Sequence, residues 1–346
     1  MKTRITEICG IKYPILLSGM SWISVPKLVA AVSNAGGLGM LATGALSPDQ
    51  TKVALKEIRS MTDKPFGANA TLLLKGGMEN ADLLLKEQVP VINFSLGKGD
   101  WIVKRAHEYG GKVFATVVNV RHAKRAQDYG SDAVIATGHE AAAHGEDATT
   151  FILVPRLAES LNIPIIAAGG IGTGRGLAAA LALGASGVAM GTRFMTTKES
   201  PLHDNYKKLS IEKDINDTIF SDRFDGMLAR MMKTPAAEKA AQEPVNLWKV
   251  FMNSQEIARE MQQPYLKLLM MVLGSGIQNA RQLFYMAKGF KSLMDATQNG
   301  DVEKGILPVG QVQGLIHDEP TVAEAIENIV TEAKKVQLHL SAQFTA

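Results

Sequence analysis

Short apolar runs alternate with longer amphipathic stretches along the first 195 residues of the chain. The runs predict eight strands, at residues 13–17, 38–42, 66–69, 91–94, 113–116, 133–136, 165–168 and 188–190. A segment able to form a helix follows each run, and strands that are apolar throughout are typical of a parallel sheet covered on both faces. Eight such units favour an α/β fold closed into a (β/α)₈ TIM barrel, with an open doubly wound sheet as the alternative.

Helix start and stop signals agree with these strands. Ser47, Pro48 and Gln50 form an N-cap, a proline at the first helical position and the closing residue of a capping box. Gly110 and Gly130 each follow a tyrosine at a point where a helix should end before the next strand. A helix over residues 121–129 is therefore expected to join strands five and six.

The pattern changes after residue 204. Nine of the sixteen methionines lie between residues 227 and 294. The sequence among them predicts helices, for example at 264–271 and 277–294. We expect a barrel over 1–204, a helical Met-rich cap over 205–305, and a C-terminal segment over 306–346 whose helix (320–340) returns to the barrel. Flexible methionines could shape an adaptable substrate cavity, although ordinary core filling explains most of them better.

Composition excludes several classes of partner. The 346 residues carry 37 basic and 34 acidic side chains, a net charge of +3, with no long basic run, so neither nucleic acid nor an anionic membrane is indicated. Hydrophobic residues make up 46%, enough for a large core. The single Cys9 and an N-terminus without the apolar stretch of a signal peptide favour a cytoplasmic protein.

The segment 137–145, which follows the sixth predicted strand, carries the most distinctive candidate chemistry. His144 lies behind three alanines at the rim of the expected barrel. Apolar neighbours lower the pKa of an imidazole, and a neutral imidazole is suited to taking a proton from a carbon acid. The alternative is a histidine with a structural role, and His139 is the second candidate for the base.

Two glycine clusters, at 168–176 and 190–194, follow strands seven and eight. Glycines let backbone N–H groups approach an anion, and barrels often bind phosphate in these two loops. A dinucleotide fingerprint does not fit, because Ile171 and Arg175 stand where it needs glycine. The clusters predict a bound phosphorylated cofactor, with plain tight turns as the alternative.

Small and neutral polar residues end four other strands: Ser18, Gly19 and Met20 after the first, Asn69 after the third, Thr116 after the fifth and Thr137 after the sixth. Such a ring suits a planar heterocycle such as an isoalloxazine. No cluster of His, Cys and carboxylates has the spacing of a metal site.

Taken together, these segments resemble the nitronate monooxygenase family, formerly called 2-nitropropane dioxygenases, which are FMN-dependent barrels. The resemblance covers almost the whole chain, including residues 18–22, 30–39, 137–145, both glycine clusters, 197–200 and 310–316. These motifs are highly specific for the superfamily and less specific for the reaction.

The resemblance implies that His144 is the catalytic base. It implies that Met20, Asn69, Thr116, Thr137 and Ala142 line the flavin, with Ser18 and Gly19 in the same cofactor-binding set, and that the FMN phosphate is held by Ala168, Gly169, Gly170, Gly191 and Thr192. The chain departs from the usual family pattern at residues 17–18, 137, 142–143 and 173, which concerns the polar contacts to the flavin more than the base.

The activity implied is the oxidation of alkyl nitronates, and of nitroalkanes, by O₂ to a carbonyl compound and nitrite. Sister enzymes on the same scaffold are FMN-dependent enoyl-acyl carrier protein reductases and NAD(P)H:quinone reductases. The second hypothesis is therefore an NAD(P)H-dependent FMN reductase of quinones or enoyl thioesters, and the third is a flavin-binding protein without catalysis.

Overall fold

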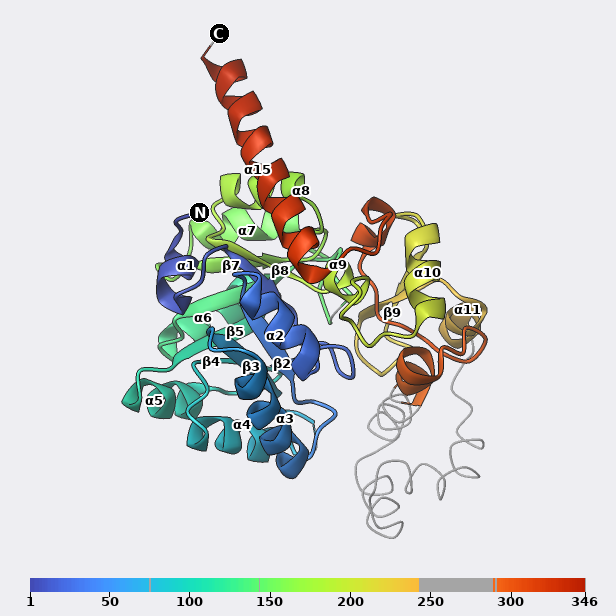
Figure 1. Cartoon of the computed structure of the whole chain (residues 1–346), viewed down its shortest axis with the longest axis horizontal. Helices are drawn as coiled ribbons and strands as arrows, with labels where there is room; N and C mark the ends of the chain where they lie inside the picture. The colour runs from blue at the N-terminus through green and yellow to red at the C-terminus, as the bar shows by residue number, and fades with distance from the viewer. Residues whose placement is uncertain (75, 143, 243–288, 290, 346) are drawn as a thin grey trace.

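Eight parallel strands form one sheet at the centre of the molecule, in the order β1-β8-β7-β6-β5-β4-β3-β2 (Figure 1). The computed structural model describes residues 1–74, 76–142, 144–242, 289 and 291–345. The gap between β1 and β2 is bridged by Leu38, whose carbonyl oxygen accepts from the Leu17 N–H (3.0 Å) and whose own N–H donates to the Ile15 carbonyl (2.9 Å). The predicted (β/α)₈ barrel is confirmed.

All eight predicted strands are present, with ends displaced by no more than two residues. They are β1 (Ile15–Leu17), β2 (Gly39–Ala42), β3 (Phe66–Thr71), β4 (Val91–Ser95), β5 (Lys112–Val117), β6 (Ala133–Thr137), β7 (Ile165–Ala168) and β8 (Gly187–Met190).

The helices alternate with the strands and cover the barrel. They are α1 (Arg4–Cys9), α2 (Pro26–Asn34), α3 (Pro48–Met61), α4 (Gly77–Lys86), α5 (Asp100–Glu108), α6 (Val120–Asp128), α7 (Thr150–Ala158), α8 (Gly174–Ala182) and the short α9 (Thr192–Met195). The predicted capping box of α3 is present, because Ser47 and Gln50 each accept the other's backbone N–H. Helices α5 and α6 end just before Gly110 and Gly130, whose φ angles of +82° and +86° favour glycine.

Strand register brings the carboxyl ends of the strands to one rim. Asn69 of β3 lies opposite Asn93 of β4, and Thr137 of β6 lies opposite Ala168 of β7. The Ser18 N–H donates to the Met190 carbonyl (3.0 Å), which extends the pairing of β1 with β8 by one step. Residues distant in sequence therefore meet at one end of the barrel, where barrels carry their ligand sites.

The segment after β8 contains an element that the sequence pattern did not predict. Helix α10 (Asp204–Glu212) is followed by an antiparallel hairpin of β9 (Thr218–Ser221) and β10 (Ala229–Met232), and then by α11 (Pro235–Gln242). Phe224, Met231 and Ile306 belong to a small separate hydrophobic core that includes residues of this hairpin. The helix expected at 264–271, and most of the one expected at 277–294, lie outside the described residues.

The C-terminal helix α15 (Val322–Phe344) follows a π-helical turn (Asp295–Asn299) and a 3₁₀ turn (Gln311–Leu315). It packs beside α8, and its far end projects beyond the body of the protein (Figure 1). The Glu199 carboxylate accepts from the Val322 N–H (2.9 Å) at the start of this helix. No described helix is both long and apolar enough to cross a bilayer.

Candidate functional site

A cavity of about 1010 Å³ opens at the carboxyl-terminal rim of the barrel. Every site residue predicted from the sequence lines this cavity: Ser18, Gly19, Met20, Asn69, Thr116, Thr137, Ala142, His144, Ala168, Gly169, Gly170, Gly191 and Thr192. Phe224, Asp225 and Met227 line it from the turn of the β9–β10 hairpin. The inserted hairpin therefore contributes to the site.

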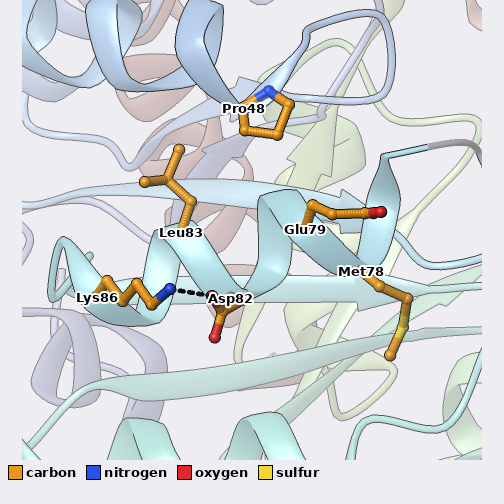
Figure 2. A pocket seen from close by; sticks show the side chains of 6 residues that line it. All are labelled: Pro48, Met78, Glu79, Asp82, Leu83 and Lys86. Carbon is orange, nitrogen blue, oxygen red and sulfur yellow. Dashed lines mark ion pairs between the residues drawn. The ribbon is translucent and has the colours of Figure 1, made fainter.

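A second depression, of about 480 Å³, lies on the outer helices. Figure 2 shows its lining side chains, which come from α4 and from Pro48 at the start of α3. Its central carboxylate, Asp82, is already paired with Lys86 (2.6 Å) and Arg105 (2.8 Å), and these hydrogen bonds lower the pKa of Asp82. This surface depression offers no convergent chemistry.

The loop after β1 is held in place by Ser24. Its hydroxyl accepts from the Met20 N–H (3.0 Å) and donates to the Ser18 carbonyl (2.7 Å). A Cβ atom at Gly19 would lie 2.9 Å from Cγ of Asn69, so a larger residue would displace the Asn69 side chain. A Cβ atom at Gly191 would lie 3.3 Å from the Met20 sulfur, which places the turn after β8 directly beside the β1 loop.

The two glycine turns offer free backbone donors. Gly169 and Gly170 have φ angles of +101° and +71°, a region that favours glycine. The N–H groups of Gly170, Gly191 and Thr192 donate no hydrogen bond within the part of the chain that the structure describes. Unpaired backbone donors at two adjacent turns fit an anionic group such as a phosphate.

Helix α8 begins just after the first glycine turn, but two N–H groups in its first turn already have hydrogen-bond partners. Its first N–H, from Gly174, donates to the Glu332 carboxylate of α15 (2.6 Å), and the Gly176 N–H donates to the Thr173 hydroxyl (3.2 Å). An anion at the glycine turns would therefore bind the turns themselves and not these helix N–H groups.

Polar side chains lie on the inner face of the barrel. The Asn93 amide donates to the Thr116 hydroxyl (3.1 Å), and that hydroxyl is also 3.2 Å from the Asn93 carbonyl oxygen. Asn69 and Thr137 are buried beside the same cavity. Asn93 was missed from the sequence, although an asparagine inside the apolar run of β4 is itself a signal, because a buried amide needs partners.

His144 lies in the loop between β6 and α7, and its imidazole Nε2 is 2.6 Å from the Asp225 Oδ2. The other carboxylate oxygen, Oδ1, accepts from the Met227 N–H (3.1 Å). Asp225 lies on the β9–β10 turn, 81 residues from His144 along the chain. No local sequence pattern connects two residues so far apart, so the sequence did not reveal this pair.

The loop that carries His144 is anchored by Arg230 of β10. This arginine is 4% exposed, and its guanidinium donates twice to the His139 carbonyl (3.2 and 2.9 Å) and once to the Thr218 hydroxyl (2.9 Å). Burial lowers the pKa of Arg230, and the nearby Glu140 opposes that change. The hairpin thus holds the loop at its start through Arg230 and at its end through Asp225.

His139, the second candidate for the base, has different surroundings. Its ring packs edge-on against Phe220 with 4.5 Å between centroids, and it does not line the cavity. In contrast His122 of α6, together with Lys98 and Arg125, lines the cavity.

The motif at 310–316 crosses the rim of the site. The Gln311 N–H donates to the Glu140 carbonyl (3.0 Å), and the Gly310 N–H donates to the Thr192 hydroxyl (3.1 Å). Arg193, which is buried, pairs with Asp318 (2.6 Å) and fixes the next part of this segment. Among the described residues, no three His, Cys, Asp or Glu side chains are grouped as metal ligands.

Comparison with known proteins identifies the family. The chain matches the nitronate monooxygenase family over residues 2–83 and 75–332. It is 33% identical to the (3aS,4S,5R,7aS)-5-hydroxy-7a-methyl-1-oxo-octahydro-1H-indene-4-carboxyl-CoA dehydrogenase of Mycobacterium tuberculosis, covering 96% of each protein. It is 32% identical to the "Probable nitronate monooxygenase" of Staphylococcus aureus, over 70% of this chain and 81% of that protein.

The structure of FabK from Thermotoga maritima is similar to this one, with a TM-score of 0.82 and 36% identity over 99% of each chain. The relatives thus include proteins with different named activities on one barrel. The family match runs from the N-terminal residues into the C-terminal helix. This chain therefore belongs to the nitronate monooxygenase family.

Proposed function

We propose that this protein is an FMN-dependent oxidoreductase that oxidises alkyl nitronates, and nitroalkanes, with O₂ to a carbonyl compound and nitrite. His144 acts as the base. The observation that supports this proposal is that the predicted base and all predicted cofactor-binding residues line one cavity at the barrel rim. Membership of the nitronate monooxygenase family agrees with it.

The residues of the cavity fit FMN. The free N–H groups of Gly170, Gly191 and Thr192 would hold its phosphate, and the small residues Gly169 and Ala142 leave room beside it. Met20, Asn69, Thr116 and Thr137 would contact the ring system. When bound, FMN would supply an acceptor for the electrons removed from the substrate.

His144 would take the α-proton of a neutral nitroalkane. The C–H bond breaks, the proton moves to the imidazole, and the electron pair stays on the substrate as a nitronate. A substrate that arrives as a nitronate has already lost this proton. The His144 imidazole is therefore required for one substrate form more than for the other.

The first prediction concerns His144→Ala. We expect nitroalkane turnover to fall by about 10²–10⁴-fold, the usual contribution of a general base, and nitronate turnover to fall much less. His139→Ala is the matched control, because its ring lies outside the cavity while its backbone carbonyl still accepts from Arg230. Oxygen consumption with each substrate measures both effects, and equal losses on the two substrates would contradict the role of His144.

A second candidate function is an NAD(P)H-dependent reduction of quinones or enoyl thioesters. The presence of Lys98, His122 and Arg125 in the lining of the cavity favours it, because a phosphate-bearing cofactor or coenzyme A thioester carries several negative charges. The similarity to a carboxyl-CoA dehydrogenase and to FabK supports the same view.

Anaerobic mixing of the FMN-loaded protein with single donors distinguishes the candidates. Bleaching of the flavin by a nitronate supports the first, and rapid bleaching by NADH or NADPH supports the second. A flavin that no donor reduces would instead identify a flavin-binding protein without catalysis.

A further inference from the structure

The contact between His144 and Asp225 is the starting point. Nε2 of the imidazole is 2.6 Å from the Asp225 Oδ2, and the Nδ1 atom makes no hydrogen bond with any residue that the structure describes. We propose that Asp225 is a positioning residue that orients the His144 base with Nδ1 free, and that its negative charge selects neutral carbon acids over anionic substrates. This inference rests on the proposed function of His144.

Hydrogen-bond chemistry assigns the tautomer. An ionised carboxylate only accepts hydrogen bonds, so the proton between the two side chains must be on Nε2. A neutral imidazole has one N–H, and its lone pair is then on Nδ1. The carboxylate thus determines which ring nitrogen can take a proton from the substrate.

The Asp225 carboxylate is itself held in place. Its Oδ1 accepts from the Met227 N–H, and the Gly226 N–H donates to the Asp222 carbonyl (3.0 Å) within the same turn. A Cβ atom at Gly289 would lie 3.0 Å from the Asp225 Cβ, so the chain passes close behind this residue. Both carboxylate oxygens are therefore engaged before any substrate enters.

Charge accounting gives the substrate preference. A neutral nitroalkane brings its own proton, so transfer to Nδ1 turns Asp225 and His144 into a neutral pair beside the new nitronate. A nitronate from solution brings no proton, so where His144 is in its base form this anion meets the uncompensated Asp225 charge. Like charges repel strongly in a partly buried site, so the free anion should bind more weakly than the neutral acid.

The test is Asp225→Asn, which keeps the size of the side chain and removes its charge. With the FMN-loaded protein, we expect kcat on a nitroalkane to fall at least about tenfold, and by no more than the 10²–10⁴-fold that the base itself contributes. We expect KM for the corresponding nitronate to fall by about tenfold, because a nearby like charge has been removed. If Asp225 had only a structural role, its substitution would not impair turnover of the nitroalkane while improving binding of the nitronate.

Asp222→Asn is the matched control, since it removes a carboxylate from the same turn three residues earlier and is expected to change neither parameter. Melting temperature and flavin affinity should match the unsubstituted protein in both variants. Unchanged nitroalkane turnover in Asp225→Asn, or equal losses on both substrates, would overturn the proposal.

A second measurement separates this proposal from the proposed function. Nitrogen-15 NMR of the imidazole should find His144 protonated on Nε2 and unprotonated on Nδ1, with the preference lost in Asp225→Asn. A protein that binds FMN and shows this tautomer, but does not oxidise nitro compounds, would refute the proposed substrate and retain the Asp225–His144 pair. Protonation on Nδ1 in the unsubstituted protein would refute the pair.

Discussion

Two histidines five residues apart have different surroundings, although both belong to one loop. His139 contributes its backbone carbonyl to Arg230 and packs its ring against Phe220. His144 lines the cavity and contacts Asp225. The difference comes from the inserted hairpin, because Arg230, Phe220 and Asp225 all belong to it. Single-residue chemistry in this loop thus depends on a segment more than 70 residues away in sequence.

Cys9 offers a test of burial at the residue scale. Its thiol is buried at the end of α1, and burial raises its pKa from 9.0 to about 12, with a smaller contribution from Asp132. Between pH 9 and 12 the unfolded chain loses this proton while the folded chain keeps it. The free energy of unfolding should therefore fall as the pH rises, by about 1.4 kcal/mol for each pH unit in this range.

Urea denaturation of the unsubstituted protein and of Cys9→Ala, at pH 8 and at pH 10.5, measures this effect. Below pH 9 the thiol is protonated in both states, so titration of Cys9 contributes nothing there. Above pH 9 the unsubstituted protein should lose more stability than Cys9→Ala. The native thiol should also resist Ellman's reagent until urea unfolds the chain. Parallel pH profiles for the two proteins would show that Cys9 is accessible in the folded state.

At the scale of elements, the turn after β7 needs glycine at position 169, because the backbone there has a positive φ. An alanine at position 169 would have to adopt a φ of +101°, which is unfavourable for a residue with a side chain, and its Cβ atom would lie 3.0 Å from the Ala141 backbone nitrogen. Gly169→Ala should therefore cost about 1–2 kcal/mol of backbone strain and also displace the loop that carries Ala142 and His144. We expect weaker FMN binding together with a lower melting temperature.

Gly110→Ala provides the control for backbone strain. Gly110 has a similar positive φ of +82°, and a Cβ atom there meets nothing within 4 Å, at the far end of α5. Both variants should melt at lower temperature, but only Gly169→Ala should weaken flavin binding in a fluorescence titration. Equal FMN affinity in the two variants would mean that the β7 turn is not part of the phosphate cradle.

For the molecule as a whole, the fold could be predicted where the hydrophobic pattern of a segment matches the place of that segment in the barrel. The eight strands are apolar runs bounded by turn signals, and a parallel barrel requires that kind of run. The ring of predicted site residues followed from the rule that strands of a barrel end at one rim. Both predictions use information that each βα unit carries by itself.

The remainder depends on contacts between distant segments. The β9–β10 hairpin lies in a Met-rich stretch without strict alternation, so its two short strands were not recognised. Asp225 reaches His144, and Glu332 reaches the start of α8, only because of how the inserted segment and α15 pack on the barrel. A single sequence contains no signal for such pairs, since neither partner is unusual in its own neighbourhood.

Helix α15 connects parts of the barrel that are far apart in the chain, and this gives a prediction at the largest scale. Ile326 is 1% exposed and packs near Gly37, before β2, while the backbone of Ile329 and Ala333 fills the space beside Gly174 of α8. The helix therefore packs against α8, which precedes β8, and against α2, which lies between β1 and β2. Ile326→Ala should cost about 2–5 kcal/mol, because it leaves a cavity in this contact.

Leu338 on the same helix supplies the comparison, because it is 66% exposed near the projecting end. Leu338→Ala removes a side chain of similar size but leaves no cavity, because that side chain is mostly in solvent. The free energy of unfolding of the protein should therefore change by no more than about 0.5 kcal/mol. Urea midpoints for both variants measure the difference. If α15 instead packed loosely on the barrel, the two substitutions would have similar small effects. A large loss of stability confined to Ile326→Ala would show that α15 unfolds together with the barrel. In that case, removing one buried side chain from the helix would also destabilise the barrel strands.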